Sequence, residues 1–429
     1  MTKIICLPPD KVPQSLNSNN KYIITYAGNH QREELGYFAP DLKKYLKKRR
    51  IKPSVVAWDF NTIALSIIAA DNAINRKKSS DGWTRQIEVD ICVCDPKPWF
   101  SVKTDFEEML RFLTGDFWIL NFFCDGTEPP TPKSERTSFD ATCLSLLSGG
   151  IDSLIGGIDL VAKGEKPILI SQIVRGDKPA QQNFADALVP EENYFQMSHK
   201  LHCPSGESES STRGRSIAFF SFAGLLASTL AESLKGKARL YVPENGFISL
   251  NIPLNGGRVG SFSTKTTHPV YLNALQKIWD DVGLDAKLIS PYRFLTKGEM
   301  LINCLNQPLM QQLIGQSTSC GKYGRHGLTH CGRCVPCMVR RAAFMKAGIM
   351  DSTKNGYKFA NLKTGGLTKG ANDIGAMAMA YIKFKTFGLR TVIGGSLSFA
   401  STQELKNYEE VFERGLDEIG DLLKAYGVI

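Results

Sequence analysis

The stretch ATCLSLLSGGIDSLIGGIDLVA, residues 141–162, decides the fold class of this chain. Leu144 to Leu147 is an apolar run typical of a buried strand, and Ser153 to Ala162 has the spacing of a helix. The turn SGGIDS joins them at Ser148 to Ser153. Two glycines let the backbone curl so that several N–H groups point into one cavity, and the helix N-terminus adds partial positive charge. The turn is therefore a candidate anion site beyond the carboxyl end of a strand.

The side chains of this turn suggest a nucleotide. Ser148 and Ser153 can donate hydroxyl bonds to phosphate oxygens, while Gly149 and Gly150 shape the backbone. Asp152 repels phosphate unless a cation lies between them, so it implies Mg²⁺. No lysine follows the second glycine, which excludes a Walker A loop. The pattern SGGxDS after an apolar strand resembles the loop of ATP pyrophosphatases, which adenylate substrates and release pyrophosphate. A Gly-Gly turn of purely structural origin is the alternative.

Strand and helix signals alternate on both sides of the turn. Continuous apolar runs at Pro167–Val174 and Leu240–Pro243 are typical of strands buried on two faces, and Asp177–Leu188 and Arg215–Leu234 are helical. This alternation predicts an α/β fold with a parallel sheet covered on both sides.

Three regions follow from the changes in pattern along the chain. Residues 1–135 mix strand signals, such as Gln86–Val93, with helical ones, such as Thr62–Asn75, and we expect a small α+β domain there. The linker-like run Asp125–Ser138 ends this domain. Residues 136–352 form the ATP domain. Residues 353–429 form a helical extension, with an amphipathic helix at Tyr408–Tyr426.

Composition and charge fit a soluble protein. The 429 residues include 42% hydrophobic and 22% charged side chains, and the net charge of +10 favours anionic partners or reflects a basic surface. Six of the ten residues from Asp41 to Arg50 are basic, which indicates a solvated helix face or a nucleic-acid or partner patch. Interrupted by Ser and Thr, the apolar stretch Ile217–Ala231 is shorter than the ~18 residues that span a bilayer. We expect a cytoplasmic protein with no membrane partner.

Further side chains could complete the nucleotide site. Arg213 and Arg215 precede a long helix and could bind an anion at its N-terminus, although Arg213 could equally lie in a solvated loop. Glu244, Asn245 and Gly246 follow a strand end and should face the same crevice, where they would contact the substrate. Asn245 could instead be a left-handed turn residue.

Lys297, in the run FLTKGE, precedes another helix. It could neutralise the triphosphate, or it could be a surface lysine at a helix N-terminus. We assign Asp152, Lys297 and Arg215 as the candidate catalytic residues.

Four of the eleven cysteines fall within 18 residues and predict a metal site. Cys320, Cys331, Cys334 and Cys337 offer four thiolates, and the two tight spacings let a short turn wrap one ion. A closed set of four ligands indicates structural Zn²⁺. Iron–sulfur ligation and four free core cysteines are the alternatives.

The ATP loop and the cysteine cluster, in this order, resemble the QueC family, the 7-cyano-7-deazaguanine synthases, over residues 141–352. The loop Ser148–Ser153 aligns with that family's ATP loop, Arg215 with the arginine that opens its long helix, and Thr296–Glu299 with its late Thr-Lys motif. The four cysteines match its zinc ligands. The resemblance implies an ATP pyrophosphatase fold and ATP-dependent activation of a 7-deazaguanine carboxylate, followed by amide and then nitrile formation with ammonia.

The chain also departs from that family. Gly246 to Pro269 lacks the usual Tyr-Pro-Asp-Cys-Arg run and carries GGRVGS at Gly256–Ser261 instead. The first ~135 residues and the last helices are additional. This layout is similar to QueC-like proteins of bacterial anti-phage defence systems, of the QatC type. It implies a protein partner from a defence operon that supplies the amine.

The sequence leaves other readings open. One is a tRNA-modifying enzyme of the thiolation type, in which Cys334 and Cys337 would be reactive. Another is a non-catalytic, zinc-stabilised protein that binds nucleic acid or a partner. A homodimer is compatible with any of these.

Overall fold

The computed structural model of the chain describes residues 3–17, 19–25, 32–133, 137, 139–173, 176–204, 208–209, 213–254, 265–363 and 372–429. The expected domain boundary at 135/136 and the run Gly256–Ser261 lie outside the described residues. The loop His202–Arg215 is described in part.

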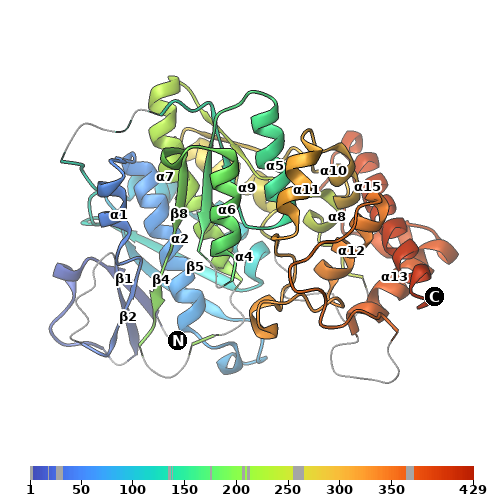
Figure 1. Cartoon of the computed structure of the whole chain (residues 1–429). Coiled ribbons are helices and arrows are strands. Elements are labelled where there is room, and N and C mark those ends of the chain that lie inside the picture. The colour runs from blue at the N-terminus through green and yellow to red at the C-terminus, as the bar shows by residue number, and fades with distance from the viewer. Residues whose placement is uncertain are drawn as a thin grey trace.

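The middle of the chain builds a five-stranded sheet that carries the SGGIDS turn (Figure 1). Its order is β11 (Ala286–Ile289), β10 (Ala238–Tyr241), β6 (Cys143–Leu146), β7 (Pro167–Gln172) and β8 (Tyr194–Met197). Neighbouring strands pair in parallel. From β6 the chain proceeds to β7 and β8 on one side, whereas β10 and β11 lie on the other. The turn after β6 therefore lies where the strand order reverses, which is where open α/β sheets bind ligands.

Helices cover both faces of this sheet. α5 (Ile151–Ala162) and α6 (Lys178–Leu188) lie on one face, and α7 (Ile217–Leu234) lies on the other. In β7, Leu169 joins the core under α5, whereas Ile168 and Ile170 join the core under α7. Burial on both faces explains the continuous apolar strands. The predicted α/β class with a parallel sheet is confirmed.

The N-terminal residues form a second sheet. Its order is β5 (Phe117–Phe123), β4 (Gln86–Cys92), β1 (Lys3–Leu7), β2 (Asn20–Thr25), β3 (Leu35–Phe38) and β9 (Leu201–His202). The strands β1 to β5 pair in parallel, and β9 joins β3 antiparallel from a distant part of the chain. The expectation of an α+β domain in residues 1–135 is wrong. The half-buried alternation of β4 is real, but helical crossovers, which the alternation does not reveal, make the pairing parallel.

Two helices pack against each other between the sheets and join them into one apolar core. They are α2 (Val55–Ala73), which covers the N-terminal sheet, and α7. α2 begins earlier than its apolar spacing indicated, because the side chain of Ser54 caps it. The segment Gly214–Leu234 is long and apolar enough to span a bilayer, but 78% of its most apolar 18-residue window is buried inside the fold. Such burial is typical of a core helix.

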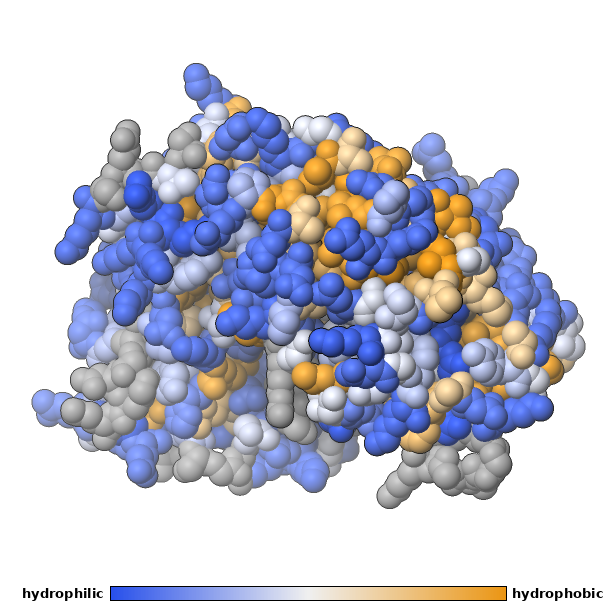
Figure 2. Space-filling view, viewed as in Figure 1, coloured by the Kyte–Doolittle hydropathy of each residue, from blue (hydrophilic) through white to orange (hydrophobic). Residues whose placement is uncertain are grey.

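The C-terminal helices form a separate apolar cluster. α13 (Asn372–Phe387), α14 (Arg390–Ile393) and α15 (Thr402–Ala425) pack with α8 (Gly246–Ser249) and α12 (Val335–Ala347). The remaining α-helices are α1 (Leu42–Lys48), α3 (Lys97–Ser101), α4 (Lys103–Thr114), α9 (Pro269–Val282), α10 (Lys297–Asn303) and α11 (Gln307–Ile314). In the space-filling view, apolar side chains gather on the surface over α5, α10 and α11 (Figure 2).

Candidate active site

The turn between β6 and α5 is held in shape by its own serines. The Ser148 N–H donates to Ser153 Oγ at 3.1 Å, and the Gly150 N–H donates to Ser148 Oγ at 3.3 Å. Gly149 has φ +89°, a left-handed conformation that side chains rarely adopt. From the opposite side, the Thr318 N–H donates to the Gly149 carbonyl at 2.9 Å. The serine hydroxyls thus order the loop as well as being available to a phosphate.

Two carboxyl groups lie together behind this loop. Asp152, in the first turn of α5, accepts hydrogen bonds from the Asn245 backbone N–H at 3.1 Å and from Asn245 Nδ2 at 2.6 Å. It also forms an ion pair with Lys297. Asn245 Nδ2 lies 3.3 Å from Glu244 Oε1, so one amide bridges both carboxyl groups.

The pKa values of the two carboxyl groups are shifted in opposite directions. Burial, with the nearby charge of Asp152, raises the pKa of Glu244 well above its usual value. Burial would also raise the pKa of Asp152, but the charge of Lys297 and the hydrogen bonds to its carboxylate lower that pKa. Asp152 is therefore the member of the pair that ionises more readily, and Glu244 is the member that keeps its proton more readily.

Lys297 occupies the first position of α10 and is buried, with 8% of its surface exposed. It is therefore not the surface lysine that the sequence left open. Thr296 accepts from the Glu299 N–H at 3.1 Å, and Glu299 Oε2 accepts from the Thr296 N–H at 2.8 Å, which completes a capping box. This cap sets the direction in which Lys297 leaves the helix.

Two residues of α15, which the sequence did not indicate, support this cap. The Thr296 hydroxyl donates to Glu418, and Arg414 Nε donates to Glu299 Oε1 at 2.6 Å. Burial raises the pKa of Glu418 to about 7. Glu418 lies 122 positions from Thr296. No local pattern could have linked them.

Two adjoining cavities open at this point. The smaller, about 190 Å³, is lined by Ser148, Gly150, Asp152, Glu244 and Lys297, among others. The larger, about 450 Å³, is lined by Ser148, Ser153, Arg213, Arg215 and Glu244, among others. Ser148 and Glu244 line both, so the cavities are neighbours. The predicted site residues come from four separate segments, and they meet at the carboxyl edge of the parallel sheet. The segments are the SGGIDS loop and those that carry Arg215, Glu244 and Lys297.

Four predicted residues have roles that the sequence did not resolve. Arg215 is exposed on the wall of the larger cavity. The guanidinium of Arg213 instead donates to the carbonyl of Thr114 in the N-terminal sheet unit, by which we mean the second sheet together with helices α1 to α4. Asn245 is not a left-handed turn residue; its φ is −69°, and its Oδ1 caps α8 by accepting from the Ile248 N–H. A Cβ on Gly246 would lie 2.3 Å from a backbone carbonyl, so glycine permits a close crossing there.

Other contacts to the loop carry no sequence signal. Gln181 of α6 is buried, and its Nε2 donates to the carbonyls of Ser148 and Gln172 at 3.1 Å each. Burial raises the pKa of Asp177, beside Gly149, to about 6. Gln181 thus holds the loop through the carbonyl of Ser148, and Asp177 packs against Gly149.

The four predicted cysteines converge on one point. Their Sγ atoms all lie within 4.8 Å of one another, and the Cys331–Cys337 and Cys320–Cys334 separations are 3.8 Å and 3.9 Å. A tetrahedron with Zn–S bonds of about 2.3 Å has S–S edges of about 3.8 Å. The donor set therefore fits a single tetrahedral ion such as Zn²⁺.

His330 stands beside the cysteines without joining them. Its Nε2 accepts from the Ser319 N–H at 3.1 Å, and its Nδ1 lies 2.8 Å from the Thr353 hydroxyl. Burial lowers the pKa of His330 to about 4, so the ring is neutral. Since Ser319 lines the smaller cavity, the histidine ties the metal module to the site.

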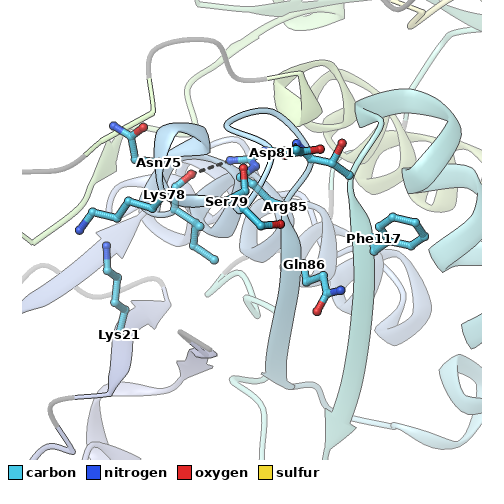
Figure 3. Close-up of a pocket in the computed structure, with 11 residues that line it drawn as sticks. Lys21, Asn75, Lys78, Ser79, Asp81, Arg85, Gln86 and Phe117 are labelled. Atoms are coloured by element: carbon cyan, nitrogen blue, oxygen red, sulfur yellow. Dashed lines mark hydrogen bonds between the residues drawn. The ribbon is translucent and has the colours of Figure 1, made fainter.

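A further hollow of about 710 Å³ lies at the amino ends of β2, β4 and β5 (Figure 3). Several of its polar side chains have partners already: Lys21 donates to the carbonyl of Ala73, Ser79 to the carbonyl of Arg76, and Arg85 to the carbonyl of Asp71. In a parallel sheet the ligand edge is the carboxyl one, so this hollow is not part of the candidate site.

Comparison with known proteins points to one activity class. The chain is 40% identical to a 7-cyano-7-deazaguanine synthase of Methanococcus maripaludis over 70 residues, 16% of this chain and 30% of that protein. It is 34% identical to the synthase of Brucella anthropi over 88 residues, 20% of this chain and 35% of that one. The synthase of Agrobacterium fabrum matches at 32% over 98 residues, 23% of this chain and 35% of the relative.

No family model matches the chain. The matched segments span about a third of the length of these curated relatives. Part of this chain is thus similar in sequence to 7-cyano-7-deazaguanine synthases, and the rest of the molecule is described by its own geometry.

Proposed function

We propose that this protein is an ATP-dependent carbon–nitrogen ligase of the QueC kind, built on an ATP pyrophosphatase fold. It would adenylate the carboxylate of a 7-deazaguanine and pass the acyl group to an amine. The meeting of Asp152, Glu244 and Lys297 at the SGGIDS loop carries this proposal. A cation between Asp152 and the phosphates would relieve their repulsion, and a lysine would stabilise the negative charge of the phosphates. The positions of Asp152, Glu244 and Lys297 fit both roles.

The acidic pair fits Mg²⁺. Asp152 and Glu244 provide neighbouring carboxyl oxygens, the ligands that this ion prefers. Bound Mg²⁺ would neutralise the charge between Asp152 and the phosphates of ATP. Lys297 would stabilise the charge that develops on the departing pyrophosphate, and Arg215 would bind the nucleotide from the larger cavity.

The reaction balances in two steps. A carboxylate oxygen of the substrate attacks the α-phosphorus of ATP, and pyrophosphate leaves with the electron pair of the broken P–O bond. The amine nitrogen then attacks the acyl carbon, AMP leaves, and the amine loses a proton. A second ATP would convert a primary amide to the nitrile. Positioning and exclusion of water decide whether the amine or water attacks.

We further propose that the cysteine cluster holds structural Zn²⁺. A four-thiolate site has no open position, so it contributes folding energy rather than chemistry. The buried, mutually adjacent Sγ atoms do not support a reactive pair of the tRNA-thiolation type.

The acceptor amine would come from a protein partner, as the similarity to QatC-type defence proteins implies. The N-terminal sheet unit and C-terminal helices lie outside the part of the chain that resembles QueC, and a docked partner would present one amine at high effective concentration. Such a role would be cytoplasmic. Ammonia is the alternative acceptor, and nitrile formation would identify it.

The test is direct. Purified protein is incubated with MgATP and 7-carboxy-7-deazaguanine, with ammonium or with candidate partner proteins, and the products are followed by mass spectrometry. We expect AMP and pyrophosphate in equal amounts and a new amide. Amide formation without ATP, or release of ADP instead of AMP, would contradict the proposal. Sulfur transfer to tRNA would favour the thiolation class.

A further inference from the structure

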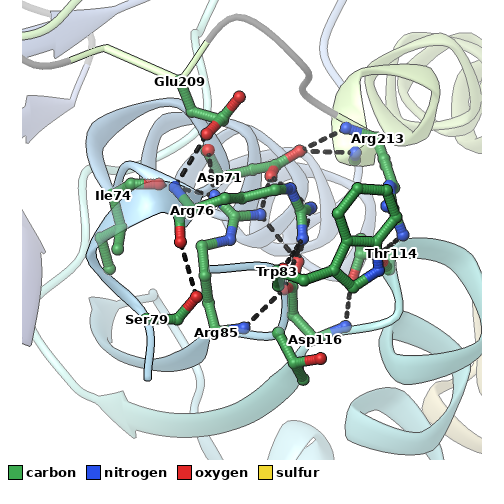
Figure 4. Close-up of polar contacts among 12 residues, drawn as sticks. Asp71, Ile74, Arg76, Ser79, Trp83, Arg85, Thr114, Asp116, Glu209 and Arg213 are labelled. Carbon is green, nitrogen blue, oxygen red and sulfur yellow. Dashed lines mark hydrogen bonds and ion pairs between the residues drawn. The ribbon is translucent and has the colours of Figure 1, made fainter. Parts of the chain in front are cut away.

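A buried cluster of charges joins the N-terminal sheet unit to the loop that precedes α7 (Figure 4). Its members are Asp71, Arg76, Arg85, Asp116, Glu209 and Arg213. Arg76 forms a two-pronged pair with Asp116 at 2.7 and 2.8 Å, and Arg85 donates to Asp116 at 2.7 Å. Three carboxylates and three guanidiniums balance, so the cluster can be buried without an uncompensated charge.

Asp71, in the last turn of α2, connects this cluster to the loop. Its Oδ1 pairs with Arg85, while its Oδ2 accepts the backbone N–H groups of Arg213 at 2.8 Å and Gly214 at 2.7 Å. The Asp71 side chain is fully buried. A Cβ on Gly214 would lie 3.2 Å from Asp71 Oδ2, so glycine lets the backbone approach the carboxylate.

The contact stands next to the nucleotide cavity. Gly214 begins the 3₁₀ turn Gly214–Ser216 that leads into α7, and Arg215 is the next residue. Arg215 is exposed on the cavity wall. Upstream, Glu209 Oε2 accepts a hydrogen bond from the backbone N–H of Arg76 at 2.8 Å, and β9 pairs with β3. The described parts of the loop are therefore held to the N-terminal sheet unit on both sides.

We propose that Asp71 is a positioning residue for nucleotide binding, which places Arg215 by holding the backbone of Arg213 and Gly214. The N-terminal sheet unit is then part of the ATP-site scaffold in addition to any docking role. The inference rests on the proposed function in one respect, that Arg215 contacts ATP. A flexible arginine loses rotational freedom on binding, and a fixed backbone reduces that loss.

A matched pair of variants tests this. Asp71→Asn removes the charge that holds the two N–H groups. Asp59→Asn is the control, since Asp59 lies on the same helix, is equally buried and accepts two backbone N–H groups, from Cys94 and Asp95. We expect Asp71→Asn to raise the Kd for MgATP about tenfold, the scale of a lost hydrogen bond to a charged group, and Asp59→Asn to leave it unchanged.

A double-mutant cycle separates positioning from general stability. If Asp71 acts through Arg215, adding Asp71→Asn to Arg215→Ala should change the Kd little further. Full additivity, or an equal loss of affinity in Asp59→Asn at matched thermal stability, would overturn the proposal.

Hydrogen exchange provides a readout that does not depend on ATP. We expect faster exchange over residues 213–220 in Asp71→Asn than in Asp59→Asn, and equal exchange would contradict the anchor. A wild-type protein that binds no MgATP would contradict the proposed function, while the exchange measurement would still decide whether Asp71 orders the loop.

Discussion

The N-terminal sheet unit and the C-terminal helices support the same site by different means. The N-terminal unit shares one apolar core with the parallel sheet and reaches the loop of Arg215 through a buried charge cluster. The C-terminal helices form their own apolar cluster and reach the cap before Lys297 through two residues of α15, Glu418 and Arg414. Each segment thus supports a different cationic residue of the candidate site.

The difference predicts different sensitivities. A balanced charge cluster resists pH but fails when one member is removed, because a buried charge is left unpaired. A single buried carboxyl group titrates. The comparison therefore separates a charge-sensitive side of the site from a pH-sensitive side.

The largest effect is expected at the point both segments serve. Asp152→Asn should reduce pyrophosphate release by at least about a thousandfold, because the acid that holds the cation is lost. Asp159→Asn is the control: Asp159 lies on the same helix, is buried and bonds to Tyr292 and Leu305 away from the cavities. If folded Asp152→Asn released pyrophosphate as fast as the wild-type protein, the site that both segments contact would not be the catalytic one.

Loss of the metal should loosen the C-terminal helices more than the N-terminal sheet unit. Cys334 is the N-cap residue of α12, and α12 packs against α15. Cys331→Ser should lose zinc and lower the melting temperature strongly, with faster hydrogen exchange in α12 and α15 than in α2. Elemental analysis gives the metal, and iron in place of zinc would contradict the assignment. Uniform loosening of both segments would remove the distinction between them.

Glu418→Ala should lower kcat about tenfold by releasing the cap that aims Lys297, the scale of one lost hydrogen bond to a charged group. Asp417→Asn, one position away, partly exposed and paired with Lys385 instead of the cap, should leave kcat unchanged. Unchanged kcat in Glu418→Ala would show that α15 only stabilises the fold.

The same carboxyl group makes a prediction for pH. Burial raises the pKa of Glu418 from 4.5 to about 7, so the folded protein holds this proton more tightly than the unfolded chain does. Its stabilising contribution is full below pH 4.5 and is lost as the pH rises through 7. Glu418→Gln should remove this loss, which amounts to about 3 kcal/mol at most. Urea unfolding of both proteins from pH 5 to 8 measures it, and parallel curves would contradict it.

The smallest effect concerns the basic run at the N-terminal unit. Arg49 donates to the carbonyls of Glu191 and Glu192 and lies 4.1 Å from the ring centre of Phe195, whereas Lys48 is exposed. Arg49→Ala should cost about 1 kcal/mol of stability and Lys48→Ala almost nothing. Thermal unfolding measures both losses of stability. Equal losses would indicate that the whole basic run is a solvated helix face.

Much of the site could be predicted because its signals are local. The SGGIDS turn, the strand before it and the helix after it are determined by a few neighbouring residues. The cysteine spacing is likewise a short-range signal, and the four Sγ atoms converge as expected. Glu244 was identified as a candidate because polar residues beyond a strand end face one edge of a parallel sheet, and Lys297 because it precedes a helix in the run FLTKGE.

What the sequence by itself determined is therefore local: the strand, glycine turn and helix around Ser148–Ser153, the set of four clustered cysteines and the α/β alternation. Tertiary structure alone decided that the N-terminal sheet is parallel, that β9 joins it, and that Asp71 and Glu418 stand behind Arg215 and Lys297. The physical reason is separation along the chain. Asp71 and Gly214 are 143 positions apart, and Thr296 and Glu418 are 122 apart. Such contacts exist only after two sheets and a helical cluster have packed, and no period or turn rule encodes them.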